Sequence, residues 1–434
     1  MQLDLFSRRL QTWSRRQKSN FSLMELSGSL GDLGTLLPIL IALSITGQIS
    51  LSSSLVFGGL WNILTGLSFG IPMCVQPMKA IAATALTSKL SIEEVMSAGM
   101  FVSACVFALG ITRTLRLVSR ITPLPVIKGI QFGAGIQLVL KAAKLIVENS
   151  SWGGSKWDWT NNFELALLSG IFVFAFFNHG KVPTALILFL VGIILAIIRM
   201  VRGVVPGPSF EFYHPVPVIP TPEQFAKGVL SAGLGQLPLT LLNSVVALAA
   251  LADELFPENA PFSIDHLSMS VGAMNLIGCW FGSMPYCHGS GGLAGQYRFG
   301  ARSELSILLL GLVKLALGLF LGNSLVTTFS NIPSTILGVM LFVCGIELAR
   351  AGRKYTNPRH SDEKQSQDFT ILVVTTGLLV GFSSDAIGFL GGLIVAYTFK
   401  AMEWLYSRES LSESPTSSTL PVVQDSDFLV PPRS

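Results

Sequence analysis

Two interrupted apolar segments contain the residues whose types could bind a ligand. The first reads GIPMCVQPMKAIAA over residues 70–83, and the second reads GSMPYCHGSGGLAGQYRFGAR over residues 282–302. In both, proline and polar residues break a run that is otherwise apolar enough for a bilayer. Paired interruptions at corresponding places in two halves of a membrane protein are the best sequence indication of a binding site near the middle of the membrane.

Each interrupted segment is predicted to be a short extended piece followed by a half-helix. In the first, residues 73–76 are extended and Pro77 opens the helix, where a missing N–H has no cost. In the second, the extended piece ends near His288 and a glycine-rich turn over residues 289–292 opens the helix. Two such helix starts direct free N–H groups and positive dipole ends, each equivalent to about half an elementary charge, into one cavity. That cavity favours an anion.

The residues at the two helix starts supply the groups that an oxyanion needs. Removing a dianion from water forfeits a large hydration energy, so a countercharge is required, and Lys79 is the natural one. Gln76 offers an amide donor and Ser290 a hydroxyl, while His288 either donates to the anion or caps the turn. Glycines here let backbone amides approach the ligand closely. The predicted binding residues are Gln76, Pro77, Met78, Lys79, His288, Gly289, Ser290, Gly291 and Gly292.

Four further polar residues are candidates for coupling or gating, because ionisable groups at membrane depth are rare and often functional. They are Asp32, Gln296, Arg298 and Glu347. Simpler interpretations stay open: Asp32 caps the first helix, Glu347 pairs with a nearby arginine cluster, and Arg298 snorkels to the membrane surface. Lys141 and Lys144 are expected to snorkel as well.

The five cysteines predict neither disulfide nor metal chemistry. They lack CxxC spacing and lie in apolar segments, so buried thiols are expected, with no metal site and no cofactor. A membrane-embedded enzyme that uses Cys287 and His288 is the alternative of a different class. Because adjacent residues of an extended piece point to opposite faces, these two side chains form a poor dyad. We therefore predict that the protein is not an enzyme.

An all-α membrane domain must position these segments. Half of the 434 residues are hydrophobic and 12% are charged, whereas soluble domains carry roughly 25% charged residues. Apolar runs of spanning length recur from about residue 30 to residue 403, which predicts about 14 transmembrane segments in a lipid bilayer. The net charge of +4 comes from short basic connections, so the positive-inside rule explains it better than a nucleic-acid partner.

The basic connections also predict the topology. Three clusters lie at residues 8–18, 113–120 and 350–364, and placing them in the cytosol puts both termini there. The uncharged loop at residues 322–331 then lies outside. Arg199 and Arg202 fall on the wrong side, which is a mild violation of the rule.

An internal repeat relates the two interrupted segments. Four residues of the first half recur in the second at an offset of 213: Gly59, Asn62, Pro72 and Cys74 correspond to Gly272, Asn275, Pro285 and Cys287. Further along, at an offset of 210, Gly135 and Gln137 correspond to Gly345 and Glu347. An odd number of segments per half requires the second half to be inverted, which brings the two interruptions face to face. The predicted divisions are a cytosolic tail at 1–24, a first repeat at 25–204, a proline-rich linker at 205–223, a second repeat at 224–403 and a disordered tail at 404–434.

Three stretches resemble the signature segments of eukaryotic molybdate transporters, distant relatives of the sulfate permeases. They read GDLGTLLP, PMCVQPMKAIAA and FGSMPYCHGSGGLAGQYRFGARS, and the resemblance extends over nearly all of residues 25–402. It implies about 14 segments in two inverted repeats with broken half-helices, a core domain that moves against a gate domain, and molybdate held between the half-helices. The family signature falls on Gln76, Pro77, Met78, Lys79, His288, Gly289, Gly291, Gly292, Gln296 and Tyr297.

The resemblance decides for molybdate over related substrates. Sulfate has the same charge and shape as molybdate, so sulfate and tungstate are expected competitors. Sulfate permeases carry a regulatory domain after the last span, whereas a short polar stretch follows Glu403 here. This difference favours the molybdate branch. A nucleobase carrier would need a carboxylate on the cavity helices, and none is expected near Gln76 or Ser290. The sequence leaves open the coupling ion, the direction of transport, a homodimer, and the choice between plasma membrane and vacuolar or other internal membranes.

Overall fold

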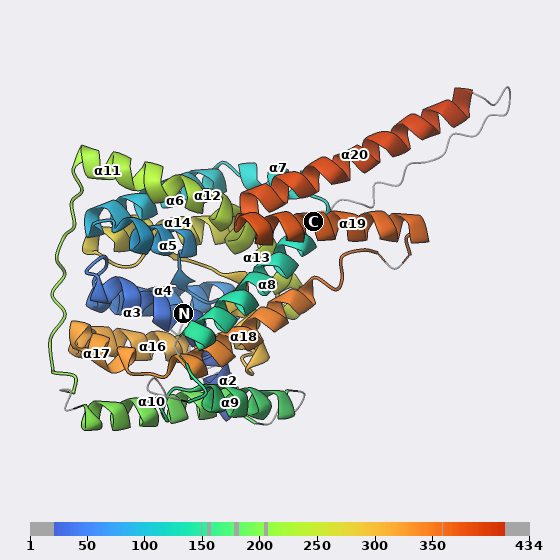
Figure 1. Ribbon diagram of the computed structural model, residues 1–434. Coiled ribbons are helices and arrows are strands. Elements are labelled where there is room, and N and C mark those ends of the chain that lie inside the picture. Colours follow the sequence, from blue (N-terminus) through green and yellow to red (C-terminus); the bar gives the residue numbers. More distant parts are fainter. Residues whose placement is uncertain are drawn as a thin grey trace, which may run out of the picture.

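The structure, a computed structural model, describes residues 21–148, 150–153, 158–177, 182–203, 207–357 and 359–412, and these are mostly helical (Figure 1). The elements before the linker are α2 (Leu23–Ser29), α3 (Leu33–Ile45), α4 (Leu51–Phe69), β1 (Gln76–Pro77), α5 (Lys79–Ser88), α6 (Ile92–Ile111), α7 (Thr114–Ile121), α8 (Leu124–Glu148), α9 (Phe163–Ala175) and α10 (Thr184–Arg202).

The elements after the linker include two π-helical turns, η1 and η2, and two 3-10 turns, η3 and η4. They are α11 (Pro222–Gly228), η1 (Val229–Gly233), α12 (Leu234–Leu241), η2 (Leu242–Val246), α13 (Ala247–Leu255), α14 (Ile264–Gly278), η3 (Cys279–Phe281), β2 (Tyr286–Cys287), α15 (Ser290–Arg298), α16 (Leu305–Phe320), η4 (Gly322–Ser324), α17 (Leu325–Ser330), α18 (Ser334–Ala351), α19 (Asp362–Phe382) and α20 (Asp385–Ser412).

Helices of membrane-spanning character recur along the chain. Among the residues described, six helices are long and apolar enough to cross a bilayer, or seven if α16 and the helical segment after it, bent by 105°, form one span. A mostly helical membrane protein is therefore confirmed, while the count of about 14 crossings stays a prediction. The prediction of a loop at residues 322–331 was wrong, because residues 325–330 form the helix α17. Its side chains Leu325 and Phe329 are buried, so this helix packs through an apolar side.

Several helices begin where the local sequence supplies a cap. Ser50 caps α4, and Ser91 and Glu94 form a reciprocal capping box at α6. Thr221 and Gln224 form a second box at α11, whose first residue is a proline. Short polar breaks in an apolar sequence thus end one helix and start the next.

Helices from the first half of the chain pack against helices from the second half. α4 lies against α16, α6 lies against α14, and α8 lies against α18 (Figure 1). Glycine permits the last approach: a Cβ on Gly135 would lie 2.7 Å from the carbonyl oxygen of Gly345, and a Cβ on Gly345 would lie 2.8 Å from that of Gly135. These two glycines correspond in the repeat, so their mutual contact agrees with a two-fold relation between the halves.

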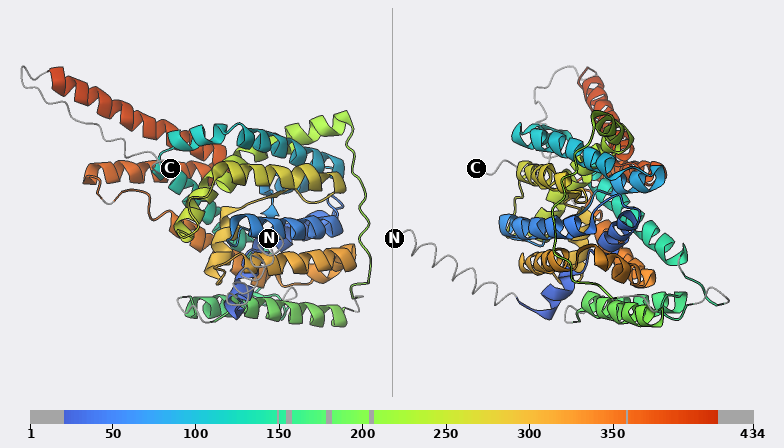
Figure 2. Two further views of the ribbon diagram at one scale, coloured as in Figure 1. Left: turned by 180° about the vertical axis from the view of Figure 1, so that it is seen from behind. Right: turned by 90° about the vertical axis from the view of Figure 1, so that its left-hand side faces the viewer.

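A second group of helices stands partly apart. α8 packs against α18, α19 and α20, α19 also packs against α20, and α19 and α20 project beyond the remaining helices (Figure 2). The backbone of α20 continues to Ser412, so the polar tail predicted from residue 404 begins later. Residues 404–412 are rich in helix formers and contain no proline, which lets the helix run on. The predicted N-terminal tail up to residue 20 and residues 413–434 lie outside the described residues.

The proline-rich linker is extended and follows one side of the molecule from α10 to α11 (Figure 1). Its backbone is anchored to helix ends: the Glu211 amide donates to the Phe320 carbonyl at 2.8 Å, and the Val218 amide donates to the Trp280 carbonyl at 2.7 Å. Proline cannot continue a helix, so this segment connects the halves without a further span.

The two arginines predicted on the wrong side of the membrane both have local partners. Arg199 lies 3.5 Å from the carboxylate of Asp158, and the guanidinium of Arg202 lies 4.8 Å from the ring centroid of Trp159. Both contacts offset the charge of these residues locally. The orientation in the membrane, to which these arginines are an exception, stays a prediction.

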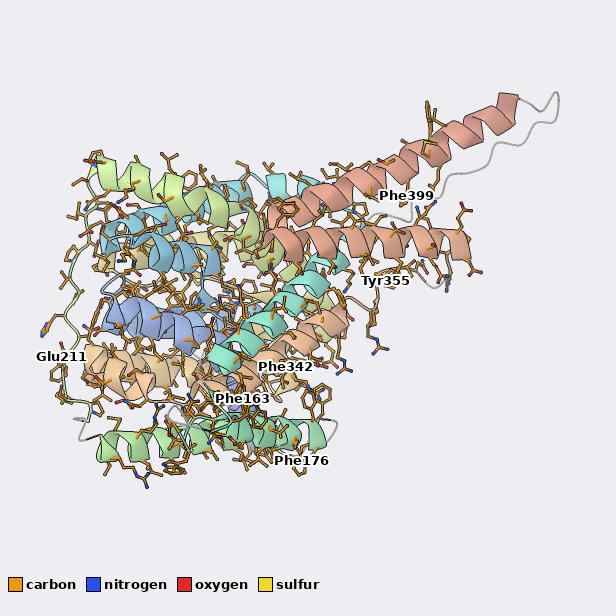
Figure 3. The ribbon with its side chains drawn as sticks, viewed as in Figure 1. Phe163, Phe176, Glu211, Phe342, Tyr355 and Phe399 are labelled. Atoms are coloured by element: carbon orange, nitrogen blue, oxygen red, sulfur yellow. The ribbon has the colours of Figure 1, made fainter. Side chains whose placement is uncertain are left out.

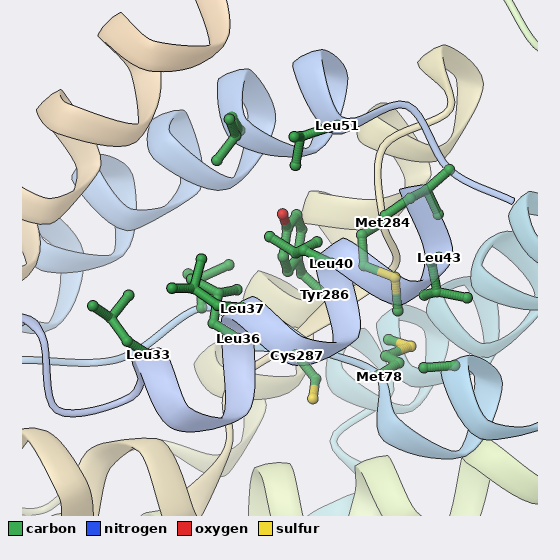
Figure 4. Close-up of a cluster of buried hydrophobic side chains, with 14 of the residues drawn as sticks. Leu33, Leu36, Leu37, Leu40, Leu43, Leu51, Met78, Met284, Tyr286 and Cys287 are labelled. Carbon is green, nitrogen blue, oxygen red and sulfur yellow. The ribbon is translucent and has the colours of Figure 1, made fainter. Parts of the chain in front are cut away.

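The core that positions the site is centred on α3. Side chains fill the space between the helices throughout (Figure 3). Leucines of α3 cluster with Met78, Met284 and Tyr286 from the two interrupted segments (Figure 4). The buried leucines are Leu33, Leu36, Leu37, Leu40 and Leu43. This apolar packing holds β1 and β2 in the interior of the protein.

Candidate functional site

The two interrupted segments meet as an antiparallel pair of short strands. Gln76 lies opposite Cys287, and Pro77 lies opposite Tyr286. The amide of Met78 donates to the carbonyl of Pro285 at 2.8 Å. Directly after the strands, α5 begins at Lys79 and α15 begins at Ser290. Both segments are thus an extended piece followed by a half-helix, as predicted.

The predicted boundaries were wrong in both segments, by two residues in the first. Pro77 lies in β1 rather than at the first position of the helix, because it pairs with Tyr286. Residues 289–292 do not form a turn: Gly289 is the extended N-cap, with φ −95° and ψ 130°, and Gly291 and Gly292 already belong to α15. Strand pairing lengthens the extended piece of the first segment, and in the second segment the helix begins where a turn was predicted.

Glycine is required at the start of α15 because other groups occupy the space of a side chain. A Cβ on Gly289 would lie 0.9 Å from the side-chain amide of Gln76, and a Cβ on Gly292 would lie 2.4 Å from Sγ of Cys74. Within the described chain, no side chain accepts a hydrogen bond from the first amides of α15. These N–H groups are therefore available to a ligand.

Gln76 connects the start of α3 to the start of α15. With its amide oriented so that both atoms are satisfied, Nε2 donates to Oδ1 of Asp32 at 3.2 Å and Oε1 accepts from the amide of Gly289 at 3.1 Å. Asp32 is the N-cap residue of α3, but its carboxylate makes no capping bond to that helix. The simpler interpretation of Asp32 as a side-chain cap was wrong, because the carboxylate is directed to Gln76 instead.

His288 holds the two segments together. Its Nδ1 lies 2.9 Å from the carbonyl oxygen of Cys74, and its Nε2 lies 2.9 Å from Oγ of Ser270. A neutral ring that donates from Nδ1 and accepts at Nε2 satisfies both neighbours. Since both nitrogens are engaged, His288 makes its contacts to the protein in this conformation. Its partners do not include the adjacent Cys287.

The start of α5 differs from the prediction because its amides have a partner. Oε1 of Gln236, on α12, accepts from the amides of Ala80 at 2.8 Å and Ile81 at 3.2 Å. The amide nitrogen of Gln236 donates to Thr240 at 2.9 Å. Two of the N–H groups that the sequence placed towards an anion are therefore satisfied within the protein.

A cavity of about 480 Å³ lies beside the starts of both half-helices and is lined by residues of α5, α8, α12, η2, α15, α18 and the α19–α20 junction. Lys79 lines it, is half-buried, and has no ion pair or hydrogen-bond partner among the residues described. Gly291 of α15 also lines it. The hydroxyl of Ser290 donates to Oδ1 of the cavity residue Asn243.

Seven polar residues of this cavity were missed by the sequence analysis. They are Thr84, Gln137, Lys141, Asn243, Ser383, Ser384 and Asp385. Lys141 was expected only to snorkel; its side chain is exposed and also lines the cavity, so snorkelling stays a prediction. The matching of Gln137 with Glu347 in the repeat was an available signal for α8.

Two predicted gating residues lie away from this cavity. Nη1 of Arg298 lies 3.7 Å from Oε2 of Glu347, which also lies 3.2 Å from Nη1 of Arg350. Neither Arg298 nor Glu347 lines the cavity. The simpler interpretation of Glu347, pairing with the arginine cluster, is confirmed. Gln296 is fully buried, and both atoms of its amide lack a partner within the described residues.

All five cysteines are free thiols, and four of them are buried, as predicted. In the part of the chain that the structure describes, no group of His, Cys, Asp and Glu side chains is arranged to hold a metal ion. The thiols of Cys74 and Cys344 donate to the carbonyls of Gly289 and Gly31.

Two half-helices that meet inside a mostly helical membrane domain define a transporter fold. The chain is similar to SLC26A9, with a TM-score of 0.58 and 18% identity, covering 88% of this chain and 65% of that one. It is also similar to the transmembrane domain of a cyanobacterium bicarbonate transporter, BicA, with a TM-score of 0.50 and 16% identity, covering 86% and 99%. The chain thus spans about two thirds of SLC26A9.

The family is shown by sequence. Residues 24–138 and 228–348 match the family model described as molybdate transporter of the MFS superfamily. Molybdate transporter 1 of Arabidopsis thaliana is 38% identical over 408 residues, covering 85% of this chain and 86% of that protein. Molybdate transporter 2 of the same plant is 37% identical, covering 89% and 90%, and molybdate transporter 1 of Chlamydomonas reinhardtii is 31% identical, covering 91% and 93%. The chain belongs to the molybdate transporter family.

Proposed function

We propose that the protein transports molybdate by alternating access, with the anion bound in the cavity beside the starts of α5 and α15. One observation carries this proposal: an unpaired lysine, Lys79, lines the same cavity as a half-helix start that no side chain caps. A cation and backbone donors without acceptors favour an oxygen-rich anion. Lys141 adds a second positive charge to the cavity wall.

The site residues divide between binding and positioning. Lys79 and the amide of Gly291 contact the anion, and Ser290, whose buried hydroxyl donates to Asn243, positions that cavity residue. A second set positions the two helix starts and does not need to touch the ligand. It comprises Asp32, Gln76, Pro77, Met78, His288, Gly289 and Gly292.

Alternating access is supported by where the cavity lies. Its wall combines α5, η2 and α15 with α8, α18 and the start of α20, which belong to the partly separate group of helices. Ion pairs bridge the two sides elsewhere: Lys128 of α8 lies 2.7 Å from Glu254 of α13, and Arg298 of α15 lies 3.7 Å from Glu347 of α18. Movement between the two sides would break and remake these contacts.

The test is uptake of labelled molybdate by the purified protein in proteoliposomes. Lys79→Ala and Ser290→Ala are each expected to reduce uptake at least about tenfold, because the first removes the countercharge of the anion and the second releases the cavity residue Asn243 from its hydrogen bond. Lys144→Ala is the matched control, since Lys144 lies on α8 but pairs with Glu148 at 3.6 Å and does not line the cavity. Normal uptake by both site variants at normal abundance would overturn the proposal.

Competition distinguishes the substrate from its relatives. Relatives of this chain are named molybdate transporters, so we expect unlabelled molybdate and tungstate to compete with labelled molybdate more effectively than sulfate does. The sequence argument against a nucleobase carrier was wrong in one respect, because the cavity does contain a carboxylate, Asp385 of α20. Inhibition by uracil but not by tungstate would favour a nucleobase over the oxyanion.

A further inference from the structure

A carboxylate inside an anion cavity requires an explanation. Asp385 is the first residue of α20 and lines the same cavity as Lys79 and Lys141. Its residue is 5% exposed, and Oδ2 is buried without a hydrogen-bond partner in the described part of the chain. No ion pair joins it to either lysine there. Asp385 is therefore not committed to holding a lysine in place.

The surroundings of Asp385 contain few other charges. The polar residues that share its cavity are Lys79 and Thr84 of α5, Gln137 and Lys141 of α8, Asn243 of η2, and Ser383 and Ser384 before α20. Lys79 and Lys141 are the charges that act on the Asp385 carboxylate.

The remaining ionisable groups on the elements packed against α20 have partners or lie elsewhere. On α8, Lys128 pairs with Glu254, and Lys144 pairs with Glu148. The charges of α19 are Asp362, Glu363, Lys364 and Asp368, all in its first turns, whereas Asp385 follows its last residue. The stretches LGQLPLTL and LNSVV of α12 and η2 contain no ionisable residue.

Charge balance gives this carboxylate a role. Counting both lysines, of which Lys141 is exposed and Lys79 is half-buried, an ionised aspartate and a dianion leave the cavity with one net negative charge. Protonation of the aspartate makes the loaded cavity neutral. An uncompensated charge away from bulk water is costly, so a dianion and a proton bind more favourably together than either would alone.

We propose that Asp385 takes up one proton when the cavity binds the dianion and releases it when the dianion leaves, which makes transport a proton–anion symport. This inference rests on the proposed function. The proton comes from water on the uptake side, is held on a carboxylate oxygen of Asp385, and returns to water on the release side. Asp385 lies on α20, in the group formed by α8, α18, α19 and α20, whereas Lys79 lies on α5. The loaded cavity therefore joins the two sides that must move.

The two carboxylates that the sequence suggested for coupling are engaged otherwise. Asp32 accepts from Gln76, and Glu347 pairs with Arg298 and Arg350. A simpler role for Asp385 also exists, because an acidic residue in a first turn stabilises a helix start. Asp362 occupies the same position in α19, is exposed, and does not line the cavity, so Asp362→Asn is the matched control.

The experiment compares the parent protein, Asp385→Asn and Asp362→Asn in proteoliposomes loaded with molybdate. Exchange of labelled for unlabelled molybdate measures the movement of the loaded carrier, and uptake driven by a pH gradient at clamped membrane potential measures coupling. Asp385→Asn is expected to retain exchange and to lose gradient-driven accumulation, while Asp362→Asn retains both. Gradient-driven accumulation by Asp385→Asn equal to that of the parent would overturn the inference.

Binding measurements supply a second readout. The affinity of the parent protein for molybdate is expected to fall by up to about tenfold per pH unit as the carboxyl ionises, since one proton accompanies each anion. Asp385→Asn is expected to bind independently of pH. In weakly buffered detergent solution, molybdate should draw one proton per site onto the parent protein, a measurement that needs no variant. Binding by the parent without proton uptake overturns this inference alone, whereas a parent protein that neither binds nor moves molybdate overturns the proposed function.

Discussion

The starts of α5 and α15 correspond in the repeat but offer an anion different chemistry. At α5 the amides of Ala80 and Ile81 are bound by Gln236, and the group left without a partner is the side chain of Lys79. At α15 no side chain caps the helix, and the first turn carries glycines and the hydroxyl of Ser290. One half of the protein supplies charge and the other supplies backbone donors.

This difference corrects a symmetric view of the site. Both helices direct the positive ends of their dipoles towards the strand pair, but the amides of α5 must be released from Gln236 before a ligand could use them. The repeat therefore positions two equivalent helix starts, and the residues around each start decide what it contributes.

The largest effect is expected from the most crowded glycine of α15. In Gly289→Ala the new Cβ would coincide with the amide of Gln76, so either the Gln76 contacts or the helix start must move. We expect transport to fall by at least about a hundredfold, with a fall in thermal stability of about 1–3 kcal/mol. The measurements are molybdate uptake and thermal unfolding in detergent.

The control for this substitution is Gly377→Ala. A Cβ on Gly377, in α19, would meet no atom within 4 Å, and alanine favours a helix interior over glycine. This variant should transport normally. If Gly289→Ala behaved in the same way, the close approach of Gln76 to α15 would not matter for function.

Much of this arrangement could be predicted because local sequence determines it. The prolines and polar residues of each interrupted segment disfavour continuous helix, and the recurrence of Pro72 and Cys74 as Pro285 and Cys287 indicates that both segments share one geometry. The glycines at 289 and 292 indicate close backbone approach. Strand pairing moved the start of α5 by two residues, since hydrogen bonds between distant segments leave no local signal.

Most of the residues that the sequence missed come from other helices. Gln236, Asn243 and Asp385 lie on α12, η2 and α20, and only the packing of these helices brings them to the half-helix starts. Lys141 was not assigned to the cavity because a lysine near a helix end has a general explanation in snorkelling. Contacts between helices far apart in the chain depend on topology, which composition and periodicity do not encode.

A second prediction sharpens the contrast at α5. Gln236→Glu keeps an acceptor for the amides of Ala80 and Ile81 but adds a negative charge beside the site. Molybdate affinity should therefore fall about tenfold, corresponding to about 1.4 kcal/mol. Gln236→Leu instead leaves both amides without their partner and should cost about 1–3 kcal/mol of stability.

The affinity of the leucine variant tests whether α5 donates to the anion. If molybdate replaces Gln236 as acceptor for these amides, Gln236→Leu should bind more tightly than the parent protein, since no internal bond has to be broken. Thr240→Val is the control, because it removes only the other hydrogen bond of Gln236. Equal affinities in Gln236→Glu and Gln236→Leu would place Gln236 outside the electrostatic reach of the anion.

The smallest effects are expected at the two cysteines that correspond in the repeat. Sγ of Cys74 donates to the carbonyl of Gly289 at 3.1 Å, so Cys74→Ala should cost about 1 kcal/mol of stability. Cys287→Ser keeps a small polar group in β2 and should leave transport within about twofold of the parent. Complete loss of transport in a folded Cys287→Ser protein would support a chemical role for that thiol. Retained transport would leave both cysteines as packing groups. The chemical difference between the two half-helices would then lie in Lys79, Gln236 and the first turn of α15.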